Sequence, residues 1–396
     1  MVHRFFQSPL VVQSMLLATC AFAFFAIFYE IGLNAVMYNY YLGGLSFMKG
    51  QDPYWVTALD GPSNQFKYSP FFAIIMAGMA KSEHPLEVIG FWVLTGMMIF
   101  SFGLSRWSDL ARKMPFYMTF ALLAALLDLI VSTSTYQANA LVIGLILLGL
   151  AEYRDGRFFT AGAILMLATN IKVYPAIFLV SMALLFRPRY WIGALCAGVV
   201  AFFLPAVFTG WTHNLEMHLA WFRVVLGDST GAGVLDLVSA FQRVGLSGLG
   251  QILRWFVLAT ALPFFFCYLP LVERTDWRPW MTFGLASLLL LSPRTEVFTY
   301  VLLAPSYVLM TSWCAESGNM KVRVYGGTLF AVLAVAISSC RYIDPQWYVS
   351  ESPLEIVRVV GALGFWILTG SIVGKAVLRS LRDKMIDAGV ARGGKA

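Results

Sequence analysis

The sequence predicts an all-α polytopic membrane protein with about twelve transmembrane helices and additional interfacial helices on the external face. Hydrophobic residues make up 59% of the chain and charged residues 12%, against about 25% charged residues in an average soluble domain. The mean hydropathy is +0.73. Apolar segments that can cross a bilayer recur along the chain, with polar loops between them. This composition excludes a soluble domain.

The positive net charge of +7 is explained by membrane topology, because the surplus lies in short loops and in the C-terminal tail. Cytoplasmic loops of membrane proteins carry such an excess, so we expect no nucleic-acid partner. The five cysteines lie in apolar surroundings without a CxxC pair. This spacing indicates buried thiols, and we expect neither a metal nor a cofactor.

The first part of the chain predicts spans that alternate with polar segments. The first span is expected at 11–29, uncleaved and with a cytoplasmic N-terminus, because His3 and Arg4 precede it and no small-residue cleavage site is evident. An external loop, 30–85, follows. Its apolar segment 71–80 is too short to cross the bilayer and predicts an interfacial or half-membrane helix. Further spans are expected at 86–105, 115–134 and 138–152.

Residues 158–186 predict a hairpin of two short helices. Arg157 and Arg187 flank its outer ends, so both ends belong on the cytoplasmic side. Pro175 ends the first helical run and begins the second. The tip of the hairpin would carry Lys172 to the external face.

The remaining chain predicts one more external loop and a set of C-terminal helices. A span at 190–209 leads to the loop 210–250, and the basic tail 378–396 is expected in the cytoplasm. The C-terminal helices fall within 251–377, with spans at 251–270, 280–292, 297–314, 324–340 and 355–377. With this assignment the arginine-rich short loops share one side, and residues 1–396 form a single membrane domain.

The segment 30–70 holds the candidates for catalysis. A general base needs a carboxylate at the mouth of a low-dielectric cavity, and Glu30 and Asp52 are the candidates. Glu30 equally fits a solvated helix end, and Asp52 fits a turn residue before proline. The same segment offers substrate-binding candidates, although an interfacial belt explains the aromatic ones almost as well; they are Tyr54, Lys67 and Tyr68.

Lys172 and Arg294 are the candidates for binding a phosphate group. An ammonium at the tip of a membrane hairpin needs water, a carboxylate or a phosphate, with snorkelling to the headgroups as the alternative for Lys172. Arg294 lies in a turn with Glu296, which either pairs with it or contacts the substrate. His213, in the second external loop, is a further substrate-binding candidate, and its spacing from His218 is not that of a zinc site.

Three segments together resemble the polytopic glycosyltransferases of family 87. They are GQDPYW…FKYSPFFAI, QANALVIGLILLGL…AGAILMLATNIKVYPAIFL and LLLLSPRTEVFTYVLLAP, in the same order as in the family and between about residues 34 and 310. Lys172, Tyr174 and Pro175 match the family's Lys-x-Tyr-Pro. Gln137 and Asn139 match its Gln-x-Asn. The Ser-Pro turn is matched by Ser292, Pro293, Arg294 and Glu296.

The resemblance implies the GT-C fold, with a GT-C-like module over residues 1–209. It also implies inverting transfer of a sugar from a polyprenyl-phosphate carrier, usually without a metal, with an acidic residue of the first external loop as base. The family commonly has an aspartate shortly before a tyrosine in this loop, where this chain has Asn34 before Tyr38 and Asn39 beside Tyr40. An amide cannot accept the proton. Either Glu30 or Asp52 has taken the role, or the activity is altered or lost.

The sequence therefore predicts a glycosyltransferase of the bacterial inner membrane that transfers a hexose, such as mannose, from a polyprenyl-phosphate donor to a lipid or glycan acceptor. The active site is expected on the periplasmic or extracellular face and both termini in the cytoplasm. Two alternatives remain open. One is a flippase or transporter of lipid-linked sugars, and the other is a non-catalytic relative that binds polyprenyl phosphate.

Overall fold

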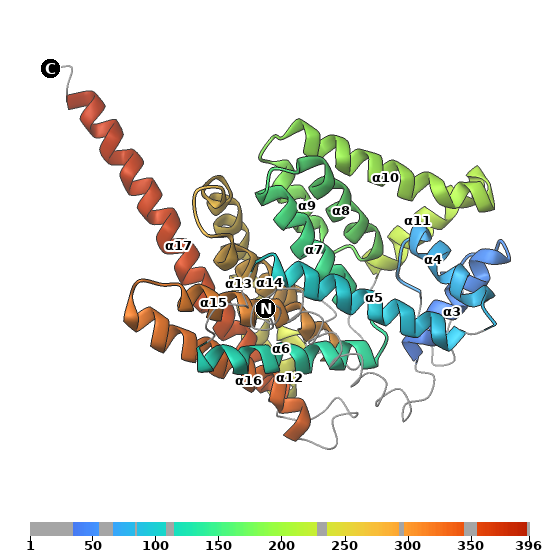
Figure 1. The fold of residues 1–396 in the computed structure, drawn as a ribbon, viewed down its shortest axis with the longest axis horizontal. Helices are drawn as coiled ribbons and strands as arrows, with labels where there is room; N and C mark the ends of the chain where they lie inside the picture. The colour runs from blue at the N-terminus through green and yellow to red at the C-terminus, as the bar shows by residue number, and fades with distance from the viewer. Residues whose placement is uncertain are drawn as a thin grey trace, which may run out of the picture. The chain divides into compact units, whose positions relative to one another are not determined.

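The computed structural model describes residues 35–54, 66–83, 85–107, 115–227, 236–292, 297–343 and 355–393. Every regular element in these ranges is a helix (Figure 1). The helices form two compact units. One holds residues 1–114, 126–232 and 297–301, and the other holds residues 115–125, 233–296 and 302–396.

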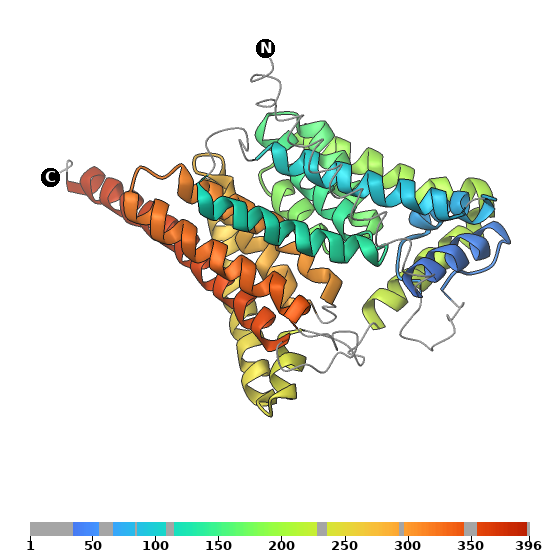
Figure 2. The same ribbon diagram turned by 60° about the horizontal axis from the view of Figure 1, so that its bottom comes forward.

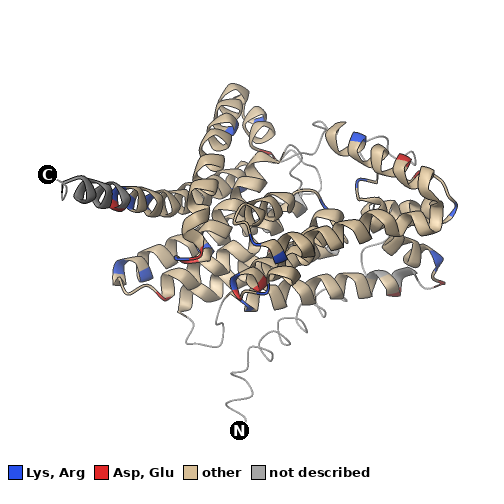
Figure 3. Ribbon diagram, turned by 90° about the horizontal axis from the view of Figure 1, so that it is seen from above, with Lys and Arg blue, Asp and Glu red and all other residues tan. Residues whose placement is uncertain are grey.

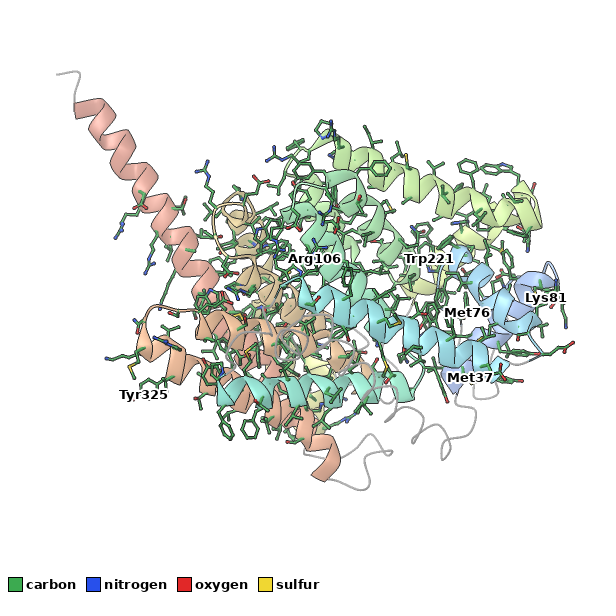
Figure 4. The ribbon with its side chains drawn as sticks, viewed as in Figure 1. Met37, Met76, Lys81, Arg106, Trp221 and Tyr325 are labelled. Atoms are coloured by element: carbon green, nitrogen blue, oxygen red, sulfur yellow. The ribbon has the colours of Figure 1, made fainter. Side chains whose placement is uncertain are left out.

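The first unit consists of helices, most of which are strongly apolar. In chain order they are α3 (Ala35–Met48), α4 (Pro70–Lys81), α5 (Pro85–Ser105), the second half of α6 (Phe116–Ser134), α7 (Asn139–Arg154), α8 (Phe158–Ile171), α9 (Ala176–Ala183), α10 (Pro188–Thr209) and α11 (Trp211–Gly227). Helix α8 packs against α7 and α10, α5 packs against α7, and α3 packs against α4. Figure 4 shows Met37 of α3 and Met76 of α4 in the same part of this unit.

Glycines allow these helices to approach backbone to backbone, as small residues do between membrane helices. A Cβ atom on Gly193 of α10 would lie 2.0 Å from the carbonyl oxygen of Phe159 in α8. A Cβ atom on Gly144 of α7 would lie 2.5 Å from the backbone nitrogen of Phe100 in α5. No side chain fits at either position, so the helix spacing depends on these glycines.

The expected external loop 30–85 contains a helix that the sequence analysis did not assign. Residues 35–48 form α3, because they include no proline and no charged residue and present a nearly continuous apolar surface to α4. Its 14 residues rise only about 21 Å, so α3 alone is too short for a 30 Å hydrocarbon core. The segment 71–80 is helical as predicted, in α4.

The second unit is also helical in its described residues. It contains the first half of α6 and α12 (Leu237–Arg243), α13 (Ser247–Val272), α14 (Trp277–Leu291), α15 (Ala304–Ala315), a π-helical turn η3 (Val322–Gly326), α16 (Gly327–Ile343) and α17 (Glu355–Gly393). Helix α14 packs against α13, α15 and α17, and α16 runs along α17 (Figure 2). A 3₁₀ segment, η2 (Val297–Leu302), precedes α15 in the chain, and its residues 297–301 belong to the first unit.

A buried arginine joins α14 to α15 in this unit. Asp276 caps α14 by accepting the backbone N–H of Arg278 at 2.9 Å. The guanidinium of Arg278 donates to the carboxylate of Asp276 and, at 2.6 and 2.9 Å, to that of Glu316. Because Arg278 is only 8% exposed, these charge-assisted bonds compensate for its loss of water.

Five of the described helical stretches are long and apolar enough to cross a membrane: Phe116–Thr133, Pro188–Thr209, Ser247–Val272, Val322–Ser339 and Ile356–Asp383. The ribbon carries its charged residues mainly near helix ends (Figure 3). The chain is therefore a helical membrane protein. The expected total of about twelve spans remains a prediction, because α7, α14 and α15 are shorter and 11–29 lies outside the described residues.

Two connections differ from the predicted organisation. The segment 210–250, expected as a loop, contains α11 and α12. The tail 378–396 does not begin as a separate segment, since α17 continues without a break to Gly393. Helix α11 is amphipathic, and a period of 3.6 residues in a polar segment also predicts a helix.

Gly193→Ala is expected to lower the midpoint of thermal unfolding of the purified protein. The added methyl group would overlap the Phe159 carbonyl oxygen, and overpacking of this kind costs about 1–3 kcal/mol. Gly198→Ala on the same helix is the matched control, because its Cβ would meet only the flexible end of Met166, at 3.4 Å. A Gly193→Ala midpoint equal to that of the control would contradict the close packing of α8 and α10.

Candidate active site

The predicted hairpin around Lys172 is present. Helix α8 ends at Ile171, and Lys172 follows in an extended conformation (φ −139°, ψ 145°) with its N–H bonded to the Ala168 carbonyl. Pro175 then precedes α9 as its N-cap, a place that suits its fixed φ. Lys172 therefore sits at the end of α8, where the chain turns.

The ammonium of Lys172 contacts three residues that the sequence singled out separately, Gln137 and Asn139 through the family resemblance and Tyr68 as a substrate-binding candidate. Its Nζ donates to Asn139 Oδ1 at 2.7 Å and to Gln137 Oε1 at 3.5 Å. It also lies 5.6 Å from the centre of the Tyr68 ring, within the range of a cation–π interaction. Residues from three distant parts of the chain thus meet at one point of the first unit. We call this group the Lys172 cluster; it contains Lys172, Gln137, Asn139 and Tyr68.

The turn between α6 and α7 brings the two amides to this point. Tyr136 has φ +58°, a left-handed conformation that is uncommon for a residue with a side chain. It follows the last turn of α6, and Gln137 donates its N–H back to the Ser132 carbonyl. Asn139 then begins α7 and is 1% exposed. The strained backbone at Tyr136 is compatible with a functional site, where such conformations concentrate.

Tyr68 is placed by the start of α4. Ser69 caps this helix by accepting the N–H of Phe72, and Pro70 is its first residue, as the Tyr-Ser-Pro sequence suits. The ring of Tyr68 stacks on Phe72 with their centres 4.5 Å apart. The preceding carbonyl, of Lys67, accepts a hydrogen bond from Trp221 Nε1 of α11 at 3.2 Å.

Tyr40 links these parts, and the sequence analysis did not select it. Its hydroxyl lies 2.8 Å from the Tyr68 hydroxyl and accepts the backbone N–H of Ala138, next to Asn139, at 3.2 Å. Tyr40 is 1% exposed, and its ring packs edge-on to Tyr68 and Phe72. The only signal in the sequence was the density of tyrosines in this segment, which does not identify the one that is buried.

Asp52 is connected to the cluster through Tyr54. The carboxylate of Asp52 accepts the N–H of Tyr54 at 2.8 Å, the arrangement of a turn residue. The Tyr54 hydroxyl donates to the Tyr68 carbonyl at 2.7 Å. Burial first, and the charge of Asp52 second, hold the pKa of Tyr54 well above its usual range, so this hydroxyl keeps its proton.

The remaining predicted site residues are Asn39, His213 and Tyr174, together with four that lie outside the described residues. Asn39 precedes Tyr40 on α3 and therefore points about 100° away from it around the helix. His213, on α11, lies 3.5 Å from the Glu216 carboxylate and eight residues before Trp221. The buried hydroxyl of Tyr174 has no hydrogen-bond partner among the described residues and lies near Tyr40. The candidates that fall outside the described residues are Glu30, Asn34, Arg294 and Glu296.

A cluster of ion pairs lies where α7 ends and α8 begins, away from Lys172. Glu152, near the end of α7, bonds to Arg157, just before α8, and to Arg106, just after α5. Asp155 pairs with Arg106 and Arg154. Since α7 begins at Asn139 and α8 ends beside Lys172, the ion-pair cluster and the Lys172 cluster lie at opposite ends of these two helices.

The described residues thus define a class of protein: a helical membrane protein with an oriented ammonium, amide oxygens and tyrosines gathered at one end of a helix bundle. Such a site suits an anionic substrate that also presents a ring or hydroxyl groups. Residues 66–293 match the model of glycosyltransferase family 87, which is more than half of the 396 residues. The chain belongs to glycosyltransferase family 87, and it is a membrane glycosyltransferase. No curated protein matches the sequence.

The matched range includes the Lys172 cluster but not all of its surroundings. Lys67, Tyr68, Gln137, Asn139 and Lys172 lie inside residues 66–293. Tyr40, Asp52 and Tyr54 precede this range, so their contribution to the cluster is known only from the structure.

Tyr40→Phe is expected to loosen the start of α7. The variant leaves the buried N–H of Ala138 without the acceptor that it has at 3.2 Å, and an unsatisfied buried donor costs about 1–3 kcal/mol. Amide hydrogen exchange, followed by mass spectrometry, should therefore quicken in the peptide that contains Ala138. Tyr38→Phe is the matched control, because Tyr38 lies on the same helix and is 37% exposed. Unchanged exchange at Ala138 in Tyr40→Phe would show that this bond does not hold the turn.

Proposed function

We propose that this glycosyltransferase moves a hexose from a polyprenyl-phosphate donor to a hydroxyl group of a lipid or glycan acceptor, with inversion at the sugar carbon, on a fold of the GT-C type. The observation that carries the proposal is the Lys172 ammonium, held by the amide oxygens of Asn139 and Gln137 beside the Tyr68 ring.

We assign to Lys172 the binding of the donor phosphate. When the bond between the sugar and the phosphate breaks, negative charge grows on the leaving phosphate, and a fixed cation stabilises it without reorganising. The amide oxygens of Asn139 and Gln137 orient the ammonium and carry no net charge themselves. Arg294, from the Ser-Pro turn, is the second cation assigned to this phosphate, and Glu296 is assigned to the substrate beside it.

Binding of the sugar and the acceptor is assigned to the tyrosines and amide side chains around Lys172 and to further polar residues. Tyr68 and Tyr54 offer ring faces, and Tyr174 offers a buried hydroxyl. Lys67, Gln137 and Asn139 complete this set, and Asn34, Asn39 and His213 are assigned to acceptor contacts. Mannose is the first sugar to test, because the resemblance to family 87 includes mannosyltransferases.

The base is assigned to Glu30, with Asp52 as the second candidate. Asp52 already accepts a backbone N–H, and hydrogen bonds to a carboxylate weaken it as a base. Glu30 lies four residues before Asn34, the position where the family commonly has an acid.

The active site is assigned to the periplasmic or extracellular face of a bacterial inner membrane. Arg106, Arg154 and Arg157 gather at the end of α7 and α8 that is opposite Lys172. Basic residues accumulate on the cytoplasmic side of membrane proteins. This arrangement supports an external Lys172 and cytoplasmic termini.

Purified protein in proteoliposomes is expected to transfer radiolabelled mannose from polyprenyl-phosphate mannose to added lipid acceptors. Lys172→Met should reduce the rate about 100- to 1000-fold, the usual effect of removing one group that stabilises developing charge. Lys49→Met is the control, since Lys49 is exposed at the end of α3. Movement of the donor across the bilayer without transfer would instead indicate a flippase, and donor binding alone a non-catalytic protein.

A second experiment identifies which carboxylate acts as the general base. Glu30→Gln is expected to abolish transfer while donor binding, measured by co-sedimentation with labelled donor, stays unchanged, because the amide cannot accept a proton. Asp52→Asn is the paired variant, and we expect it to keep most of the activity. Loss of transfer in Asp52→Asn with full activity in Glu30→Gln would assign the base to Asp52 instead.

A further inference from the structure

Helix α11 begins directly at the end of α10, in a fixed orientation. Gly210 ends α10 with φ +80°, and its carbonyl accepts the N–H of Asn214, so the chain turns within one residue (Figure 1). The side chain of Asn214 donates back to the Phe202 carbonyl at 2.9 Å, and His218 packs on the Phe202 ring. The start of α11 is therefore tied to the side of α10.

The circumference of α11 has three faces. The inner face packs against α10 and α4 and holds Asn214, Met217, His218 and Trp221. A second face carries exposed apolar side chains spaced three or four residues apart, which we call the apolar stripe: Trp211, Leu215, Leu219, Phe222 and Leu226. The third face is polar and exposed, with Thr212, Glu216 and Arg223.

The exposure of the apolar stripe is large for a surface helix. Its five members are between 42% and 86% exposed. A helix with one buried face needs no second apolar face in water. An apolar face beside a polar one is typical of a helix that lies in the plane of a membrane surface.

The apolar stripe is continuous with the outer surface of α10. The ring of Trp211 stacks on Phe203 of α10, with centres 5.4 Å apart. Phe203 belongs to a row of exposed apolar residues on this candidate span, with Leu195, Val199 and Val207. In a membrane protein such a row faces acyl chains. A lipid that covers the end of α10 therefore reaches the apolar stripe as well.

We propose that α11 is a membrane-surface helix whose apolar stripe is inserted among the acyl chains of the bilayer, with Glu216 and Arg223 at the level of the headgroups and water. The inner face then links the bilayer to the Lys172 cluster, because Trp221 donates to the Lys67 carbonyl beside Tyr68. The proposal concerns lipid contact alone and does not depend on the proposed sugar transfer.

Site-directed spin labelling tests the proposal. Single cysteines are introduced at Leu219, on the apolar stripe, and at Glu216, on the polar face, after replacement of the five native cysteines. Each variant is labelled with a nitroxide in proteoliposomes, and its collision rates with oxygen and with a water-soluble nickel chelate are measured by power saturation. Oxygen concentrates among acyl chains and the nickel chelate in water. Leu215→Cys, on the apolar stripe, and Thr212→Cys, on the polar face, repeat the comparison with the same expected order.

The expected result is a high ratio of oxygen to nickel collisions at Leu219 and Leu215, and the reverse order at Glu216. Two results would overturn the proposal. Nickel collisions at Leu219 as frequent as at Glu216 would place the apolar stripe in water. Protection of Leu219 from both reagents would show that protein, such as a second copy of this chain, covers it. Elution of each variant as wild type in size-exclusion chromatography checks that the fold is kept.

Discussion

The ammonium of Lys172 is the point at which the segments of the candidate site meet in the first unit. A charged group at the end of two short apolar helices loses much of its water, and it is stable there only with polar partners. The start of α7 supplies Asn139 and Gln137, and the entry to α4 supplies the ring of Tyr68. Each of these partners is held in turn by a backbone feature, namely the left-handed Tyr136 and the Ser69 cap.

Close helix packing makes this convergence possible. Lys172 meets Asn139 because α7 and α8 pack closely, and a Cβ atom on Gly149 would lie 2.6 Å from Leu165. Gly162 and Gly193 bring α8 equally near to α10. Interiors at this density do not deform continuously, so the position of the ammonium follows from the packing of backbone on backbone.

Besides the ammonium, the site contains a group of tyrosines around Lys172. Tyr40, Tyr54 and Tyr68 form a hydrogen-bonded set in which the Ala138 N–H and the Tyr68 carbonyl also take part. Two of the three precede the range that matches glycosyltransferase family 87. The part of the chain before residue 66 thus completes a cluster whose cation and amides belong to the family's range.

The sequence by itself determined the helical membrane character and the family, and it singled out Lys172, Gln137 and Asn139 without indicating that they meet. Hydropathy and short motifs report local composition, and a break such as Ile-Lys-Val-Tyr-Pro marks the tip of a hairpin wherever the hairpin lies. The short apolar helix 71–80 was predicted for the same reason. Asp52 was weighed both as a base and as a turn residue, and its bond to the Tyr54 N–H is that of a turn residue.

Only the tertiary structure decided which tyrosine is buried, that α3 is a helix, and that α11 exposes an apolar stripe beside α10. These properties arise from contacts between segments far apart in the chain, such as Tyr40 with Ala138 and Trp221 with Lys67. Burial and exposure are set by what packs against a helix, and a one-dimensional pattern carries too little information about that neighbour.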